Sequence, residues 1–380
     1  MSSGSRVRAH SATAGSSDIR LSPSESLRGH LCFSGCATLL EVFERSCLRF
    51  GDRPCLGERA IDHAGRASRF VFKSYQEVHQ LVLEMTSGLQ TGDLVRTKGF
   101  LGLYMKNCSY WVIAEQACYQ MNAITVPLYD TLGRDAVAFV IRQVEMETIL
   151  CSPGEIGALI AAKERCPSLR HVIVTSAFSR DVETEAESVG LRLHNVLDVL
   201  QSGTRSPCQP SPPSSQDLCT ICYTSGTTGV PKGAMLTHGN LVSAAAGGLE
   251  AFMRVTESDC YLSFLPLAHI FERLAITAVL CSGGAVGFSR GSPLLLVEDL
   301  QALQPTVFCA VPRLLSRIHD KIVQRAEGTD LASRLLRSAI ATKLHRLKTY
   351  GSLSHLFYDS LVFAKIKASL GLNRVKFLLR

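Results

Sequence analysis

Residues 221–240 read Ile-Cys-Tyr-Thr-Ser-Gly-Thr-Thr-Gly-Val-Pro-Lys-Gly-Ala-Met-Leu-Thr-His-Gly-Asn, and this stretch decides the fold of the chain. An apolar run that ends at Tyr223 predicts a buried strand, which leads into a loop of hydroxyls and glycines. A second short apolar run and a helix start follow the loop. Glycines let backbone N–H groups converge on phosphate oxygens, and the hydroxyls and Lys232 add donors and a mobile positive charge. The composition therefore predicts a phosphate-binding loop.

This loop differs from the commonest phosphate-binding motifs. The pattern G-x-x-x-x-G-K-[ST] requires a glycine before the lysine, whereas Pro231 precedes Lys232 here. The dinucleotide pattern G-x-G-x-x-G is absent as well, because Gly226 and Gly229 are three residues apart. The competing interpretation is a mobile Ser/Thr/Gly linker without a ligand. Strands predicted on both sides and the fixed Pro-Lys-Gly exit favour the phosphate loop.

Three stretches carry a resemblance to a known family. Residues 223–233, Tyr-Thr-Ser-Gly-Thr-Thr-Gly-Val-Pro-Lys-Gly, resemble without a gap the phosphate loop of the adenylate-forming (AMP-binding) enzymes, such as acyl-CoA synthetases, nonribosomal-peptide adenylation domains and luciferases. Residues 126–133 (Val-Pro-Leu-Tyr-Asp-Thr-Leu-Gly) and 265–273 (Leu-Pro-Leu-Ala-His-Ile-Phe-Glu-Arg), with Val-Pro-Arg-Leu at 311–314, resemble the eukaryotic-type long-chain fatty-acid–CoA ligases of that superfamily. The resemblance runs from about Leu40 to Phe377.

The resemblance implies a fold and a reaction. The expected fold is α/β, the N-terminal lobe of the adenylate-forming fold, with mostly parallel sheets flanked by helices. The expected reaction is the ATP-dependent activation of long-chain fatty acids to acyl-CoA. The fatty carboxylate attacks the α-phosphate of ATP to give acyl-AMP and pyrophosphate, and the thiol of coenzyme A then displaces AMP. ATP, Mg²⁺ and coenzyme A are therefore the expected co-substrates and cofactor. The alternative is a catalytically dead fragment of such a ligase that binds nucleotide or lipid.

The resemblance also assigns candidate site residues. The phosphate cradle comprises Thr224, Ser225, Gly226, Thr227, Thr228, Gly229 and Lys232, and the Thr224 hydroxyl is the candidate Mg²⁺ ligand. Lys232 and His269 are the candidate catalytic residues, with His269 at the junction between an acyl tunnel and the phosphates. Pro266, Leu267, His269 and Phe271 are candidates for the tunnel wall, and ordinary core packing remains open for them. Without the resemblance, a lone histidine among apolar residues is more often a hydrogen-bonded core residue.

Composition restricts the classes of protein that fit. The chain has 380 residues, 46% of them hydrophobic, and a net charge of +7. Residues 313–380 contain 14 Lys and Arg against 4 Asp and Glu, a net of +10, whereas the first 312 residues carry 26 against 29, a net of −3. This basic region predicts a peripheral contact with an acidic membrane surface, or a solvated helix face, and disfavours nucleic acid because aromatic residues are not interleaved with the charges. Fourteen cysteines without framework spacing indicate reduced thiols of an intracellular protein, cytosolic or peripheral on an organelle membrane such as the endoplasmic reticulum. No apolar run is long enough for a transmembrane helix.

Apolar periodicity and turn residues divide the chain. Residues 1–30 are expected to be disordered. Residues 31–380 are expected to form an incomplete AMP-binding large domain that lacks the C-terminal small domain, so weak or no activity is expected of the chain as given. A Pro- and Ser-rich linker is expected at 201–217. Predicted helices cover 39–50, 74–89, 110–121, 133–144, 154–165, 239–255, 270–281 and 296–303, and a basic helical region opens at Val311-Pro312 and runs to about 370. Predicted strands cover 70–72, 100–105, 124–128, 148–151, 171–175, 218–223, 261–265, 285–288, 306–310 and 374–379. Such alternation predicts parallel sheets with helices on both faces.

Overall fold

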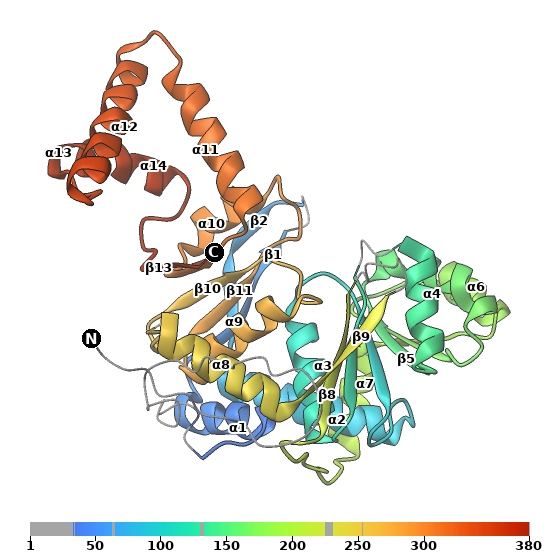
Figure 1. Ribbon diagram of the computed structural model, residues 1–380. Helices are drawn as coiled ribbons and strands as arrows, with labels where there is room; N and C mark the ends of the chain where they lie inside the picture. Colours follow the sequence, from blue (N-terminus) through green and yellow to red (C-terminus); the bar gives the residue numbers. More distant parts are fainter. Residues whose placement is uncertain are drawn as a thin grey trace, which may run out of the picture.

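The computed structural model describes residues 33, 35–62, 65–129, 133–224, 231–252 and 254–379. The segment 1–30 that was expected to be disordered lies outside these residues, as do residues 225–230 of the phosphate loop. In the described part, strands form two sheets that lie side by side with helices between and around them (Figure 1). This confirms the expected α/β fold with mostly parallel sheets.

The first sheet has seven strands and is parallel except at one edge. In spatial order it comprises β7 (Arg192–Asn195), β6 (His171–Val174), β5 (Thr148–Cys151), β3 (Phe100–Tyr104), β4 (Ile124–Pro127), β8 (Leu218–Thr224) and β9 (Lys232–Thr237). Only β8 and β9 pair in antiparallel fashion. The β4 and β5 strands are buried throughout, as expected for short apolar runs covered by helices on both faces.

The second sheet has six strands, and β1 and β2 form its antiparallel edge pair. Its spatial order is β13 (Phe377–Leu379), β12 (Val307–Cys309), β10 (Cys260–Ser263), β11 (Ala285–Phe288), β1 (Pro54–Ile61) and β2 (Ala67–Ser74). The sequence did not predict β1, because Pro54 and Gly57 weaken the strand pattern there.

Helix boundaries follow from local sequence signals. The helix α1 (Leu39–Phe50) begins with a capping box of Thr38 and Glu41, and α2 (Tyr75–Thr91) begins with a capping box of Ser74 and Glu77. Ser74, the first residue of the range predicted as a helix at 74–89, is thus the N-cap of α2. Pro312 is the first residue of α11, as its fixed φ favours.

The largest core cluster lies between the two sheets. It joins α1 and α2 to α3 (Ser109–Gln120), α8 (His238–Phe252) and α9 (Ile270–Cys281). A second cluster packs α4 (Gly133–Gln143), α5 (Ile156–Ala162) and α6 (Arg180–Ser188) on the outer face of the seven-stranded sheet. A third places α10 (Leu296–Leu303) against the six-stranded sheet. Single-turn 3₁₀ helices flank α5 at Pro153–Glu155 and Lys163–Arg165.

The expectation that 201–217 is a linker without packed structure is wrong for its first residues. Helix α7 covers Val196–Arg205 and packs against α2, because Val196, Val199, Leu200 and Gly203 form one buried face. Further along, the Cys208 N–H donates to Ser87 Oγ at 3.1 Å and the Ser211 N–H to the Gln120 carbonyl at 2.8 Å. The helix therefore continues past residue 201, because the apolar residues that begin at Val196 pack its first turns, although the residues after 205 are rich in Ser and Pro.

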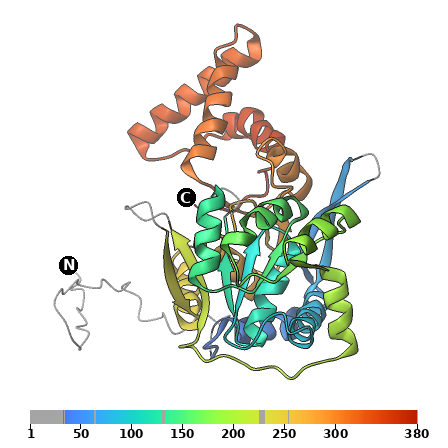
Figure 2. The same ribbon diagram turned by 90° about the vertical axis from the view of Figure 1, so that its right-hand side faces the viewer.

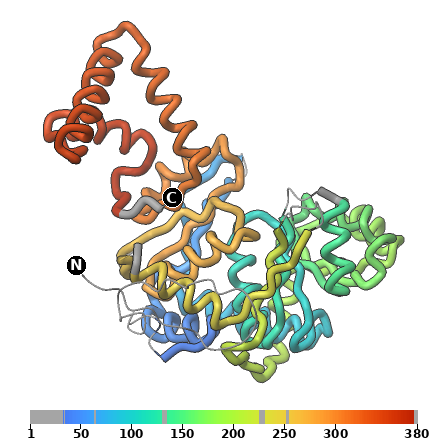
Figure 3. The backbone as a smooth tube through the Cα atoms, viewed as in Figure 1, coloured from blue at the N-terminus to red at the C-terminus, as the bar shows by residue number. Residues whose placement is uncertain are grey.

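The basic region forms a helical arm that stands off from the sheets. It consists of α11 (Pro312–Ala326), α12 (Leu331–Tyr350), α13 (Leu356–Tyr358), a π-helical turn η3 (Asp359–Phe363) and α14 (Ala364–Ser369). The tube in Figure 3 leaves the body along α11 and returns past α14 to the edge strand β13. No helix in the described ranges combines the length and the apolar character that crossing a bilayer requires.

Candidate functional site

The phosphate loop spans the turn of the β8–β9 pair. Thr224 and Lys232 are register partners at the open end of this pair, so they mark the two ends of the loop. Both side chains are exposed to solvent. The strands expected on each side of the loop are therefore confirmed, while Ser225, Gly226, Thr227, Thr228 and Gly229 lie outside the described residues.

A cavity of about 120 Å³ opens where strands of both sheets end. Its wall consists of Met105, Lys106, Asn107, Leu128, Tyr129, Phe264, Pro266, Leu267, Ala268, Ser289 and Gly291. These residues follow β3 and β4 of one sheet and β10 and β11 of the other. Ligands of open α/β sheets bind outside the carboxyl ends of parallel strands, so the cavity occupies the place where a binding site is expected.

The structure divides the predicted acyl-side residues into two groups. Pro266 and Leu267 line the cavity. His269 and Phe271 lie at the start of α9, exposed to solvent, and they are not part of the cavity wall. His269 is the N-cap of this helix, where its Nδ1 accepts a hydrogen bond from the Phe271 N–H at 3.3 Å.

Asn107 holds the loop that carries Pro266 and Leu267, and the sequence did not predict this role. Its amide nitrogen donates to Ser263 Oγ at 2.8 Å and to the Leu265 carbonyl at 2.6 Å. Its amide oxygen accepts from the Leu267 N–H at 2.9 Å. One side chain from the β3 edge therefore fixes the backbone of the opposite cavity wall.

A buried carboxyl group is connected to Asn107 through Ser263. Glu272 is completely buried and accepts hydrogen bonds from Tyr261 Oη at 2.5 Å and from Ser263 Oγ at 2.6 Å. Burial raises the pKa of the Glu272 carboxyl from 4.5 to about 8, and the two hydrogen bonds oppose that rise. Glu272, Ser263 and Asn107 thus form a continuous polar chain that ends at the cavity.

The next residue of α9 points to the other sheet. Arg273 is buried, forms an ion pair with Glu115 of α3 and donates to Thr220 Oγ1 of β8 at 2.7 Å. It also donates to Tyr119 Oη and Thr125 Oγ1, each at 3.3 Å. Because the guanidinium is paired and hydrogen-bonded, its burial is tolerated, and it ties α9 to the sheet that carries the phosphate loop.

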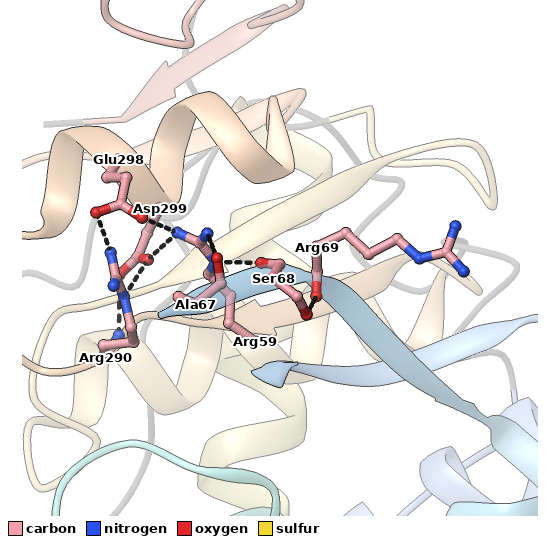
Figure 4. A network of polar contacts seen from close by, with 7 residues as sticks. All are labelled: Arg59, Ala67, Ser68, Arg69, Arg290, Glu298 and Asp299. Carbon is pink, nitrogen blue, oxygen red and sulfur yellow. Dashed lines mark hydrogen bonds and ion pairs between the residues drawn. The ribbon is translucent and has the colours of Figure 1, made fainter. Parts of the chain in front are cut away.

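A network of charged side chains holds the cavity wall that the loop after β11 forms at Ser289 and Gly291, and Figure 4 shows this network. Asp299 of α10 accepts from the Arg290 backbone N–H at 3.0 Å and from Arg290 Nε at 2.8 Å. Arg59 of β1 reaches Glu298 at 2.7 Å and the carbonyls of Ala67 and Ser68 at 2.7 and 2.6 Å. The network therefore joins the loop after β11 to the β1–β2 pair.

Gly291 continues that wall in a left-handed backbone conformation that favours glycine. Its φ is +71°, and a Cβ atom at this position would lie 2.6 Å from Cδ of Lys106. Lys106 itself lines the cavity and is exposed. The sequence did not point to this lysine, which contributes a positive charge at the cavity mouth.

The described residues do not by themselves make a magnesium site. Thr224 offers one hydroxyl, its register partner is a lysine, and no group of three His, Cys, Asp or Glu side chains suited to a metal occurs in the part of the chain that the structure describes. Protein-bound Mg²⁺ usually has one or two carboxylates plus substrate phosphates as ligands.

Comparison with known proteins gives one family. Residues 43–358 match the family described as AMP-binding enzyme. Over 346 residues the chain is 38% identical to long-chain-fatty-acid–CoA ligase 5 of Rattus norvegicus, which covers 89% of this chain and 50% of that protein. Long chain acyl-CoA synthetase 4 of Arabidopsis thaliana is 36% identical over 345 residues, covering 88% of this chain and 51% of that protein. The chain thus spans about half the length of the curated relatives it matches.

A solved structure shows the same fold. The A-PCP didomain of carboxylic acid reductase from Segniliparus rugosus, in complex with AMP, matches with a TM-score of 0.71 at 21% identity. The match covers 93% of this chain and 54% of that one. At this identity the likeness concerns the fold alone.

Proposed function

Because the chain belongs to the AMP-binding enzyme family, we propose that it takes part in the ATP-dependent activation of long-chain fatty acids to acyl-CoA. The observation that carries the proposal is the cavity at the carboxyl ends of strands of both sheets, because its wall includes residues that follow β4, the neighbour of the strand β8 that leads into the phosphate loop. The 38% identity to a long-chain-fatty-acid–CoA ligase supports the substrate class.

The proposed reaction has two chemical steps. A carboxylate oxygen of the fatty acid attacks the α-phosphorus of ATP, the bond to the bridging oxygen breaks, and pyrophosphate leaves. The sulfur of coenzyme A then attacks the acyl carbon, AMP leaves, and the thiol proton is released. Since the first nucleophile is already an anion, positioning and charge neutralisation supply most of the catalysis.

In this proposal the phosphate loop holds the β- and γ-phosphates of ATP. Residues 225–229 supply backbone N–H groups and hydroxyls, and Lys232 supplies the positive charge from the far end of the loop. The Thr224 hydroxyl is the group of this chain that would hold a Mg²⁺ ion. When bound, that ion would neutralise phosphate charge.

We propose that the acyl carboxylate binds in the cavity, next to the wall residues 266–268. Pro266 and Leu267 supply apolar surface there, and His269 and Phe271 stand where α9 begins. Asn107 keeps this wall in place through the Leu265 carbonyl and the Leu267 N–H.

The proposal includes a peripheral contact of residues 313–380 with a membrane. The net charge of +10 in this region supports it, because acidic lipid surfaces attract basic segments. The proposal also includes an intracellular location, either cytosolic or peripheral on an organelle membrane such as the endoplasmic reticulum.

The test is an assay of the purified chain with ATP, Mg²⁺, palmitate and coenzyme A that measures pyrophosphate and acyl-CoA separately. Formation of both products supports the proposal, and omission of coenzyme A should then leave only the first step. Nucleotide binding without either product favours the alternative of a binding protein without turnover. Absence of both nucleotide binding and turnover contradicts the proposal.

A further inference from the structure

The helical arm is a separate structural unit with its own small core. Ala326, Leu336, Ala339 and Val362 are the buried residues of that core. Figure 2 shows the arm rising from one end of the body, away from both sheets. Its root follows directly on β12, which pairs in parallel with β10.

The second half of the arm, from α12 to η3, exposes several large apolar side chains. We call them the apolar ridge, which consists of Leu344, Leu347, Tyr350, Leu353, Leu356, Phe357 and Leu361. Leu356 is 90% exposed and Tyr350 is 69% exposed. Leu344, Leu347 and Tyr350 recur every three residues, so they follow one side of α12, and the others continue through the next turn into α13 and η3.

The charge around the apolar ridge is almost entirely positive. Residues 331–371 contain seven Lys and Arg and one acidic residue, a net of +6. That acidic residue, Asp359, is already paired with Lys343. The side chains of Lys348, Lys365 and Lys367 are exposed, and no ion pair joins them to an acidic group within the described ranges.

We infer that the apolar ridge enters the headgroup boundary of an anionic lipid bilayer while the surrounding lysines and arginines bind the lipid phosphates. This inference rests on the membrane contact proposed above and names the residues that make it. Helical segments with exposed leucines and aromatics flanked by basic residues lie in this boundary, where apolar groups leave water and long basic side chains reach the charged surface.

The chemistry favours a lipid surface over other occupants. An apolar strip alone would also fit another protein, but the ridge is bordered by one sign of charge, which an anionic surface complements continuously.

The test is co-sedimentation of the whole chain with vesicles of phosphatidylcholine alone and of phosphatidylcholine mixed with phosphatidylserine. The wild-type chain should sediment with the mixed vesicles, and added salt should weaken the binding. The double variant Leu353→Ser, Leu356→Ser should lose at least about tenfold in vesicle partitioning, because two exposed leucines no longer enter the bilayer. Lys348→Gln combined with Lys365→Gln should reduce binding to the mixed vesicles only.

The matched control is Leu48→Ser combined with Leu294→Ser. These leucines are 88% and 92% exposed, but they lie on α1 and before α10, on the body of the molecule. The control should bind vesicles as the wild-type chain does. Thermal unfolding of all variants establishes that each is folded.

Three results would overturn the inference. The first is a wild-type chain that does not sediment with the mixed vesicles. The second is a ridge variant that binds vesicles as the wild type does, which would place the membrane contact elsewhere. The third is a ridge variant whose oligomeric state changes in size-exclusion chromatography while its lipid binding does not, which would make the ridge an interface between chains. Acyl-CoA formation in detergent solution is measured separately, so a failure of the proposed catalysis is distinguished from a failure of docking.

Discussion

Lys232 stands at one end of the phosphate loop, opposite Thr224 across the β8–β9 pair. If its ammonium holds ATP phosphates, Lys232→Ala should weaken ATP binding by about 1.5–3 kcal/mol, the worth of a charge-assisted hydrogen bond. Titration calorimetry with ATP measures this directly. Lys73→Ala is the control, because Lys73 is an exposed lysine near the end of the edge strand β2 in the other sheet. Equal ATP affinity in wild type and Lys232→Ala would contradict the cradle assignment.

Glu272 gives the molecule a specific dependence of stability on pH. Its pKa is about 8 in the folded chain and 4.5 ordinarily, so between these values the folded state binds more protons than the unfolded state. The free energy of unfolding should therefore fall as pH rises through this window, with a contribution from this group of up to about 1.4 kcal/mol per pH unit. Below pH 4.5 the contribution is fully present, and above pH 8 it is lost.

The variant Glu272→Gln should remove that contribution because its amide does not ionise. Urea unfolding between pH 4.5 and about 8 should show a flatter decline than for the wild type. Glu164→Gln, at an exposed position, is the control and should follow the wild-type profile. If the free energy of unfolding of Glu272→Gln falls with pH as steeply as that of the wild type, the buried carboxyl is not the cause of the pH dependence.

At the scale of secondary-structure elements, the contact between α2 and α7 depends on Gly203. A Cβ atom at this position would lie 1.8 Å from the Glu84 carbonyl oxygen, so the two helices must separate to admit a side chain. Gly203→Ala should therefore destabilise the chain by about 1–3 kcal/mol through overpacking.

The control for this prediction is Gly157→Ala in α5, where an added Cβ meets no atom within 4 Å. Alanine favours a helix, so this variant should be neutral or more stable by about 0.5–1 kcal/mol. Chemical denaturation of both variants gives the comparison. A neutral Gly203→Ala would mean that α7 is not packed as described.

The elements that sequence could predict are those whose signal is local. Strands such as β5 and β11 are continuous apolar runs, and α9 and α10 have the boundaries that their apolar spacing predicts. The strand β1 escaped prediction because its evidence is its pairing with β2 and β11, which are distant in sequence or separated by a turn. At α7 the prediction of a linker relied on composition, but four buried residues keep the chain helical up to Arg205, before most of the Ser- and Pro-rich residues.

The candidate site was predictable to a similar degree. The phosphate-loop ends and the wall at Pro266 and Leu267 follow from motifs that are contiguous in sequence. The role of Asn107 was not predictable, because its partners Ser263 and Leu267 lie more than 150 residues away. Glu272 and Arg273 belong to a motif recognised in the sequence, but the motif does not reveal that both side chains are buried or which groups they bind.

At the scale of the whole molecule, the arm and the body are expected to open separately. The arm has its own core, and Leu336 is among its buried residues. Leu336→Ala should cost about 2–5 kcal/mol of local stability in the arm. Hydrogen exchange should therefore accelerate in α12 and η3 while the strands β3 and β5 keep their protection.

Leu159→Ala provides the reciprocal test, because Leu159 is buried in the cluster on the seven-stranded sheet. This variant should accelerate exchange in β5 and β6 and leave α12 unchanged. If either variant accelerates exchange in both units alike, the arm and the body unfold together and the prediction is wrong.

The adjacent pair on α9 has a consequence for how this chain can vary in length. Glu272 binds Tyr261 and Ser263 of one sheet, and Arg273 binds Glu115 of α3 and Thr220 of the other sheet. Successive residues of a helix are about 100° apart, so inserting or deleting one residue before position 272 would turn the carboxyl and the guanidinium toward the wrong sheets. The segment between β10 and α9 should therefore tolerate substitutions of the residues that line the cavity far better than the insertion or deletion of a residue.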